Sequence, residues 1–143
     1  MIAEIRAVKR SGKNTFYLVD AGFNNLIRPS MYGSFHPISI VPRSGKLENR
    51  LEHDVVVGGP LCESGDIFTQ EEGGVVCTRK LPVAEVGDFL VLEVAGAYGF
   101  VMGSNYNSKP LAPEILVASG HPHLVRARQT FEDLIRGESI PPG

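Results

Sequence analysis

The chain has 143 residues, of which 43% are hydrophobic and 21% are charged, and its formal net charge is −2. This length predicts one domain with a single buried core, and the small net charge argues against nucleic acid or an anionic membrane as a partner. The sequence contains no apolar stretch long enough to cross a membrane, and its charged N-terminal residues do not resemble a signal peptide, so a cytoplasmic protein is expected.

Short apolar runs rich in valine, isoleucine and phenylalanine recur along the chain, and each is closed by glycine, proline or asparagine. This pattern predicts β-strands. The expected strands are residues 1–10, 15–21, 36–43, 52–59, 65–70, 87–96, 113–120 and 123–130. Tight turns are expected at residues 9–14 and 71–75, where glycine can adopt a positive φ. Because the connections are mostly short, antiparallel pairing is favoured over helical crossovers.

Two short segments predict helices. Pro29 has a favourable first-turn position, so Pro29–Tyr32 is expected to form a single turn with Arg28 and Tyr32 near one face. Near the C-terminus, Thr130 is a candidate N-cap, with Asp133 in place of the usual glutamate.

Gly137 is the expected stop of that C-terminal helix. No internal repeat or low-complexity tract divides the chain. The expected fold is therefore mainly β: a single antiparallel or Greek-key barrel domain over residues 1–143, with one or two short helices.

A glycine-bounded loop, GPLCESGD, follows the strand expected at residues 52–59 and contains Cys62. A neighbouring carboxylate, Glu63, disfavours the thiolate, which makes a proton donor a better interpretation than a nucleophile. The alternative is a buried cysteine that packs as a small hydrophobic residue, with Glu63 and Asp66 solvated in a turn. Cys62 could also pair with Cys77, although two thiols are the expectation in a reducing compartment.

Arg28 and Tyr32 form a second candidate site. A guanidinium can bind a carboxylate with two hydrogen bonds, and a tyrosine hydroxyl one turn away can add a third. The alternative is a surface arginine whose aliphatic stem packs on a tyrosine ring.

Tyr98 lies between two small residues, so a cofactor or another backbone could approach it closely. The alternative for Tyr98 is a core ring in a strand. His121 and His123 alternate without a partnering cysteine or acid, and no metal site is expected.

Four segments, taken together and in this order, resemble the C-terminal β-domain of the diaminopimelate decarboxylases, a family of pyridoxal-phosphate enzymes of the alanine-racemase-like group. The segments are FYLVDAGFNNLIRPSMYGSFHPI, GPLCESGDIF, GAYGFVMGSNYNSKPLAPEIL and LVRARQTFEDLI. They extend from Phe16 to Ile135 and so cover nearly the whole chain. One such motif would be weak evidence, but four in order are strong.

The resemblance implies roles for five residues. Arg28 and Tyr32 would bind the distal carboxylate of meso-diaminopimelate, and Glu63 its distal ammonium. Cys62 would return a proton to the reacting carbon after carbon dioxide leaves. Tyr98 would contact both the substrate and pyridoxal 5′-phosphate.

The resemblance also implies that the complete enzyme is a homodimer that makes L-lysine, with the Cys62 loop reaching into the partner subunit's site. The N-terminal (β/α)₈ cofactor barrel of the family has no counterpart in these residues, so we expect this chain alone to be inactive, to bind no cofactor and to self-associate. Ornithine and arginine decarboxylases usually carry aspartate after the cysteine, which makes them, and carboxynorspermidine decarboxylase, weaker alternatives. A non-catalytic β-domain that binds a small molecule or a protein is the alternative from another class.

Overall fold

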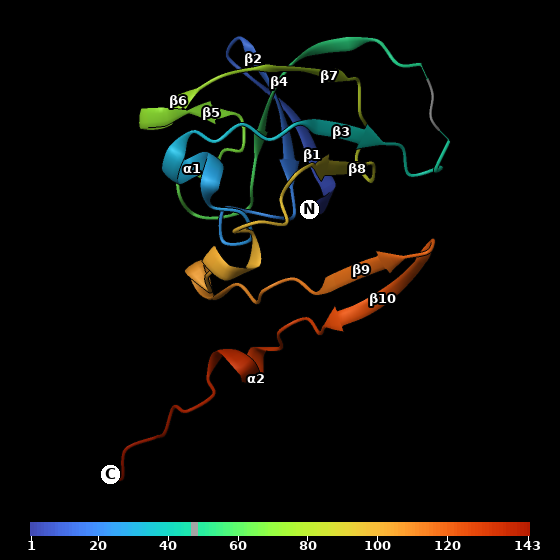
Figure 1. The fold of residues 1–143 in the computed structure, drawn as a ribbon. Helices are drawn as coiled ribbons and strands as arrows, with labels where there is room; N and C mark the ends of the chain where they lie inside the picture. The colour runs from blue at the N-terminus through green and yellow to red at the C-terminus, as the bar shows by residue number, and fades with distance from the viewer. Residues whose placement is uncertain (47–48) are drawn as a thin grey trace. The chain divides into compact units, whose positions relative to one another are not determined.

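The computed structural model describes residues 1–46 and 49–143. These residues form two compact units, Met1–Gly103 and Ser104–Gly143. The first unit holds most of the strands and the second a hairpin followed by a short helix (Figure 1). Among the described residues no helix is both long and apolar enough to span a membrane.

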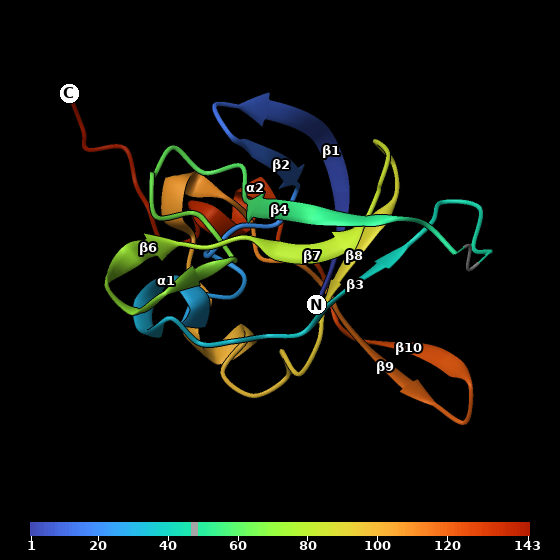
Figure 2. The same ribbon diagram turned by 90° about the horizontal axis from the view of Figure 1, so that it is seen from above.

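The first unit is built on a six-stranded sheet with the order β3-β8-β1-β2-β4-β7. Its strands are β1 (Ile2–Ser11), β2 (Asn14–Val19), β3 (Ile38–Val41), β4 (Glu52–Gly58), β7 (Arg79–Pro82) and β8 (Phe89–Leu92). Seen from above, β2, β4 and β7 run side by side (Figure 2). A separate pair consists of β5 (Gln70–Glu71) and β6 (Val75–Val76).

The alternation of side chains explains why the sheet has one buried face. In β1, Ala3 and Ile5 are buried while Glu4 and Arg6 point outward, as the period of two in a strand requires. The edge strands β3 and β7 contact each other, so the sheet curls into a nearly closed barrel around Tyr17 and the other buried apolar residues. The predicted mainly β barrel is confirmed.

The pairing differs from the prediction in one respect. All pairs of the large sheet are antiparallel except β2 and β4, which are parallel, with Thr15 opposite Val55. A parallel pair needs a long connection, and here the chain between the two strands passes through a helix and β3 before it returns.

Several strand predictions were wrong in extent. Of residues 65–70, only Gln70 lies in a strand, and Ile67 makes an isolated bridge to Gly58. Side-chain hydrogen bonds hold this segment instead of a strand ladder, as described below. The sequence analysis missed β7, because its four residues RKLP show no apolar run and end in proline.

The short helix α1 (Arg28–Tyr32) forms where the sequence predicted it, and it lies beside β5 and β6 (Figure 1). Pro29 is buried in the first turn, and Gly33 ends the helix with φ of 60°. A Cβ atom at Gly33 would lie 2.1 Å from the backbone nitrogen of Glu72. Only glycine therefore allows α1 to pack against the 3₁₀ turn η1 (Glu72–Gly74) in this way. A further 3₁₀ turn, η2 (Phe100–Met102), ends the first unit.

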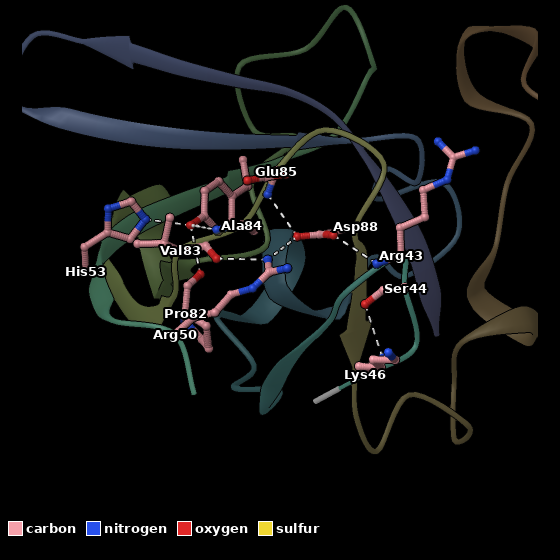
Figure 3. A network of polar contacts seen from close by, with 11 residues as sticks. Arg43, Ser44, Lys46, Arg50, His53, Pro82, Val83, Ala84, Glu85 and Asp88 are labelled. Carbon is pink, nitrogen blue, oxygen red and sulfur yellow. Dashed lines mark hydrogen bonds and ion pairs between the residues drawn. The ribbon is translucent and has the colours of Figure 1, made fainter. Parts of the chain in front are cut away.

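A polar network anchors the loops around β7 and β8 (Figure 3). The carboxylate of Asp88 accepts hydrogen bonds from the backbone nitrogens of Arg43 at 3.0 Å and Glu85 at 2.9 Å, and pairs with the guanidinium of Arg50 at 2.5 Å. The buried hydroxyl of Tyr17 donates to the carbonyl of Pro82 at 2.9 Å. These contacts thus tie together the segment after β3, the segment before β4, the end of β7 and the loop between β7 and β8.

The second unit contains the antiparallel hairpin of β9 (Glu114–Ala118) and β10 (His121–Arg126), the 3₁₀ turn η3 (Tyr106–Ser108) and the helix α2 (Phe131–Leu134). The predicted capping box is confirmed, because Thr130 and Asp133 exchange hydrogen bonds at the start of α2. The helix ends at Leu134, earlier than the expected stop at Gly137.

Candidate functional site

The side chain of Arg28 lies near two tyrosine rings. Its guanidinium carbon is 5.2 Å from the centre of the Tyr32 ring and 5.1 Å from the centre of the Tyr98 ring. Both distances are within the range of cation–π attraction. The structure therefore brings together three of the five predicted site residues from two distant segments of the first unit.

The backbone explains how this cluster is presented. Arg28 opens α1 and Tyr32 closes it, so both project from one short helix. Tyr98 has φ of 61°, a left-handed conformation that is uncommon outside glycine and marks strain. Tyr98 and Tyr32 expose 57% and 50% of their surfaces. The alternative interpretation of Tyr98 as a core ring is therefore wrong.

Cys62 and Glu63 lie on the loop that follows β4, and both are exposed. The carboxylate oxygen Oε1 of Glu63 accepts hydrogen bonds from the backbone nitrogen of Gly65 at 3.1 Å and from the hydroxyl of Ser64 at 3.2 Å. The two cysteines of the chain are thiols and form no disulfide. An exposed Cys62 contradicts the alternative in which this residue packs as a small hydrophobic side chain.

The carbonyl of Gly65 fastens the far end of this loop. It accepts hydrogen bonds from the hydroxyl of Ser30, in α1, at 2.9 Å and from the side-chain nitrogen of Gln70 at 3.0 Å. Gln70 also donates to the carbonyl of Ile67 at 2.7 Å. The helix that carries Arg28 is thus hydrogen-bonded directly to the loop that carries Cys62.

Asp66 is a residue that the sequence analysis interpreted wrongly. Its alternative placement was a solvated turn, but only 3% of its surface is exposed. One carboxylate oxygen accepts from the backbone nitrogen of Phe23 at 2.7 Å and the other from that of Leu61 at 2.8 Å. Burial raises the pKa of the Asp66 carboxyl, although both amide hydrogen bonds oppose this shift and nearby Glu63 adds to it.

Two glycines, Gly59 and Gly22, leave room for the buried carboxylate of Asp66. A Cβ atom at Gly59 would lie 2.2 Å from Asp66 Oδ2, and one at Gly22 would lie 2.9 Å from the same atom. Two glycines that leave room for an acid are a recognisable pattern only when the segments are known to be adjacent.

The two neighbouring histidines, His121 and His123, are exposed on β10. Among the described residues, no three histidine, cysteine, aspartate or glutamate side chains are grouped so that they could hold a metal ion.

Proteins of one known family resemble this chain. The family described as "Pyridoxal-dependent decarboxylase, C-terminal sheet domain" matches residues 1–96. The chain is 55% identical over 141 residues to the diaminopimelate decarboxylase of Escherichia coli strain K12, covering 98% of this chain and 34% of that protein. It is 50% identical over 141 residues to the Streptomyces coelicolor enzyme, covering 99% of this chain and 32% of that protein.

Solved structures show the same likeness. A crystal structure of diaminopimelate decarboxylase matches with a TM-score of 0.92 and 54% identity, over 94% of this chain and 32% of that one. The M. jannaschii diaminopimelate decarboxylase in complex with L-lysine matches with a TM-score of 0.84 and 33% identity, over 99% of this chain and 30% of that one.

The chain thus spans about a third of the length of the curated relatives that it matches. The family match and the shared fold agree with each other. The chain belongs to the C-terminal sheet domain family of the pyridoxal-dependent decarboxylases.

Proposed function

We propose that this chain is the C-terminal domain of a diaminopimelate decarboxylase, which converts meso-diaminopimelate to L-lysine and carbon dioxide. The observation that carries the proposal is the Arg28 guanidinium within cation–π distance of the rings of Tyr32 and Tyr98. Aromatic rings near a guanidinium attract its charge, and its planar set of N–H donors suits two parallel hydrogen bonds to a carboxylate. Ornithine and arginine have no distal carboxylate for this group to bind.

In this proposal the Arg28 guanidinium and the Tyr32 hydroxyl bind the distal carboxylate of the substrate. The Glu63 carboxylate binds the distal ammonium. When the bond between the reacting carbon and its carboxylate breaks, the electron pair stays with the carbon, and the thiol of Cys62 donates a proton to that carbon. The exposure of Cys62 and Glu63 on a hydrogen-bonded loop supports this division of roles.

The residues of this chain fit a contribution to a pyridoxal-phosphate site. Tyr98 offers an aromatic ring with more than half of its surface exposed, fixed beside the carboxylate-binding arginine. Pyridoxal phosphate, when bound, serves as the sink for the electron pair of the broken bond. The described residues thus supply one wall of such a site, and the complete protein would supply the lysine that holds the cofactor.

We also propose that the complete enzyme is a cytoplasmic homodimer in which the Cys62–Glu63 loop serves the partner subunit's active site. Two cysteines that remain thiols suit a reducing compartment. An exposed loop that lies beyond the end of a strand and is fixed at its base can extend into another subunit.

A domain exchange tests the proposed function. The C-terminal third of the E. coli enzyme is replaced by this chain, and release of carbon dioxide is measured with diaminopimelate, ornithine and arginine, each with pyridoxal phosphate. Activity with diaminopimelate alone supports the proposal. Activity that favours ornithine or arginine assigns another decarboxylase, and a folded, dimeric and inactive hybrid indicates a non-catalytic binding domain.

A further inference from the structure

Asp66 lies beneath the loop that carries the proposed proton donor, and it contacts that loop from inside the protein. Its Oδ2 accepts the amide of Leu61, the residue directly before Cys62, at 2.8 Å. The backbone nitrogen of Asp66 donates to the carbonyl of Glu63 at 3.1 Å, and the backbone carbonyl accepts from Gly59 at 2.9 Å. One residue therefore holds the loop before Cys62 and after Glu63.

The same carboxylate also contacts the segment that leads to Arg28. Its Oδ1 accepts the amide of Phe23 at 2.7 Å, in the segment that leads into α1. Ser30, within α1, makes a second bridge through the carbonyl of Gly65. The Cys62–Glu63 pair and the helix carrying Arg28 are thus held on one frame by two hydrogen-bonded anchors.

We propose that Asp66 is a positioning residue for the decarboxylase reaction, which, with Ser30 as a second anchor, fixes the loop that carries Cys62 and Glu63 to the first unit and so holds both side chains in place for the partner subunit's site. The inference rests on the proposed function for its consequence in catalysis. The carboxylate touches no reacting atom: it acts through the amide of Leu61 and the backbone of its own loop. Misplacement of a catalytic group by about 1 Å can lower a rate by about a hundredfold.

The test substitutes Asp66→Asn, which keeps the size of the side chain but replaces one of its two acceptor oxygens with a donor that faces a backbone N–H. The matched control is Asp88→Asn. Asp88 is 4% exposed, close to the 3% of Asp66, and it likewise accepts two backbone amides, but in the network around Arg50. Both variants should lose stability, whereas only the first should disturb the Cys62 loop.

Two readouts separate these roles. Hydrogen exchange on this chain should show at least tenfold faster exchange at residues 59–66 in Asp66→Asn, with no such change there in Asp88→Asn. In the active hybrid enzyme, Asp66→Asn should lower kcat at least tenfold, because Cys62 is displaced, and should also raise the KM for diaminopimelate, because Glu63 is displaced with it. Asp88→Asn should change kcat by less than twofold at a temperature where both variants are folded.

Equal effects of the two variants on kcat or on exchange at residues 59–66 would overturn the proposal. If Asp66→Asn does not fold, Ser30→Ala is used instead, because it removes only the hydrogen bond from Ser30 to the Gly65 carbonyl. A fall in kcat of threefold or more then supports the anchoring of the Cys62 loop. An unchanged kcat with unchanged hydrogen exchange overturns it. An inactive unsubstituted hybrid would count against the proposed function alone, since hydrogen exchange still tests the role of Asp66.

Discussion

At the scale of single residues, the proposed function depends most on Arg28. A lysine at this position would keep the positive charge but could not bind a carboxylate through two parallel hydrogen bonds. Tyr98 also holds a strained left-handed backbone that the surrounding fold must maintain. The proposed carboxylate-binding role therefore needs a guanidinium and not merely a cation.

We predict that Arg28→Lys in the hybrid enzyme raises the KM for diaminopimelate by about tenfold to a hundredfold, since hydrogen bonds to charged groups contribute about 1.5–3 kcal/mol. Steady-state kinetics measure this. The control is Arg79→Lys, because Arg79 also lies over an aromatic ring, that of Phe35 at 3.8 Å, but has no proposed substrate role. A KM that is unchanged in Arg28→Lys would contradict the carboxylate-binding role.

At the scale of elements, the five-residue helix α1 is fixed because Gly33, at its end, packs closely against the backbone of η1. Gly33 combines a left-handed φ of 60° with a virtual Cβ only 2.1 Å from the Glu72 backbone. Gly12, in the β1–β2 turn, has nearly the same φ of 58° but has nothing within 4 Å. Alanine substitutions at Gly12 and Gly33 therefore separate the free-energy cost of a left-handed backbone from the cost of a steric clash with Glu72.

Gly12→Ala should lower the free energy of unfolding by about 1–2 kcal/mol, the cost of a left-handed non-glycine residue. Gly33→Ala should cost at least about 1 kcal/mol more, because packing between α1 and η1 must also open. Urea denaturation of this chain provides both values. Equal losses in the two variants would show that α1 does not depend on this close approach.

The Asp88 network makes a second element-scale prediction, on pH. Burial opposes ionisation of Asp88, but the amides of Glu85 and Arg43 and the guanidinium of Arg50 outweigh it, so the pKa of this carboxyl is lowered. A lowered pKa in the folded state gives stability that is complete above about pH 3.9, the ordinary value, and is lost as the pH falls through the folded value.

Asp88→Asn should therefore lower stability most at neutral pH, and its difference from the unsubstituted chain should shrink below about pH 4. Unfolding in urea at pH 7, 5, 4 and 3 measures this difference. Asp54→Asn serves as the control, since Asp54 is an exposed partner of Lys80 at 3.8 Å. A difference that stays constant down to pH 3 would show that ionisation of Asp88 contributes nothing.

At the scale of the whole molecule, the hairpin of the second unit exposes a concentration of apolar side chains. Ile115, Leu116, Val117, Leu124 and Val125 each expose more than half of their surface. Clustered exposed apolar residues usually mark an interaction surface. This observation supports the expectation that the chain on its own associates with a second copy.

We predict that the mass-average molecular weight of this chain rises with concentration in light scattering. The double variant Ile115→Lys and Leu124→Lys, whose residues face each other across the two strands, should reduce this association. Ile140→Lys is the control, because Ile140 is 95% exposed but lies outside the hairpin. A strictly monomeric profile of the unsubstituted chain at all concentrations would contradict the prediction.

Local signals allowed much of this protein to be predicted from its sequence. Apolar runs predicted seven of the strands, which are β1 to β4 and β8 to β10. Pro29 predicted the first turn of α1, and Thr130 with Asp133 predicted the capping box of α2. Each of these features depends on residues within one turn or one strand. The motifs containing Arg28 and Cys62 pointed to the family for the same reason.

The tertiary structure alone decided features that depend on segments far apart in the chain. Parallel pairing of β2 with β4, the proximity of Tyr98 to Arg28 and the burial of Asp66 all arise from contacts between distant residues. An acidic residue beside glycine suggests a solvated turn when only its neighbours are known. Asp66 is stable inside the protein because two backbone amides, one of them from a segment over forty residues earlier, donate hydrogen bonds to it.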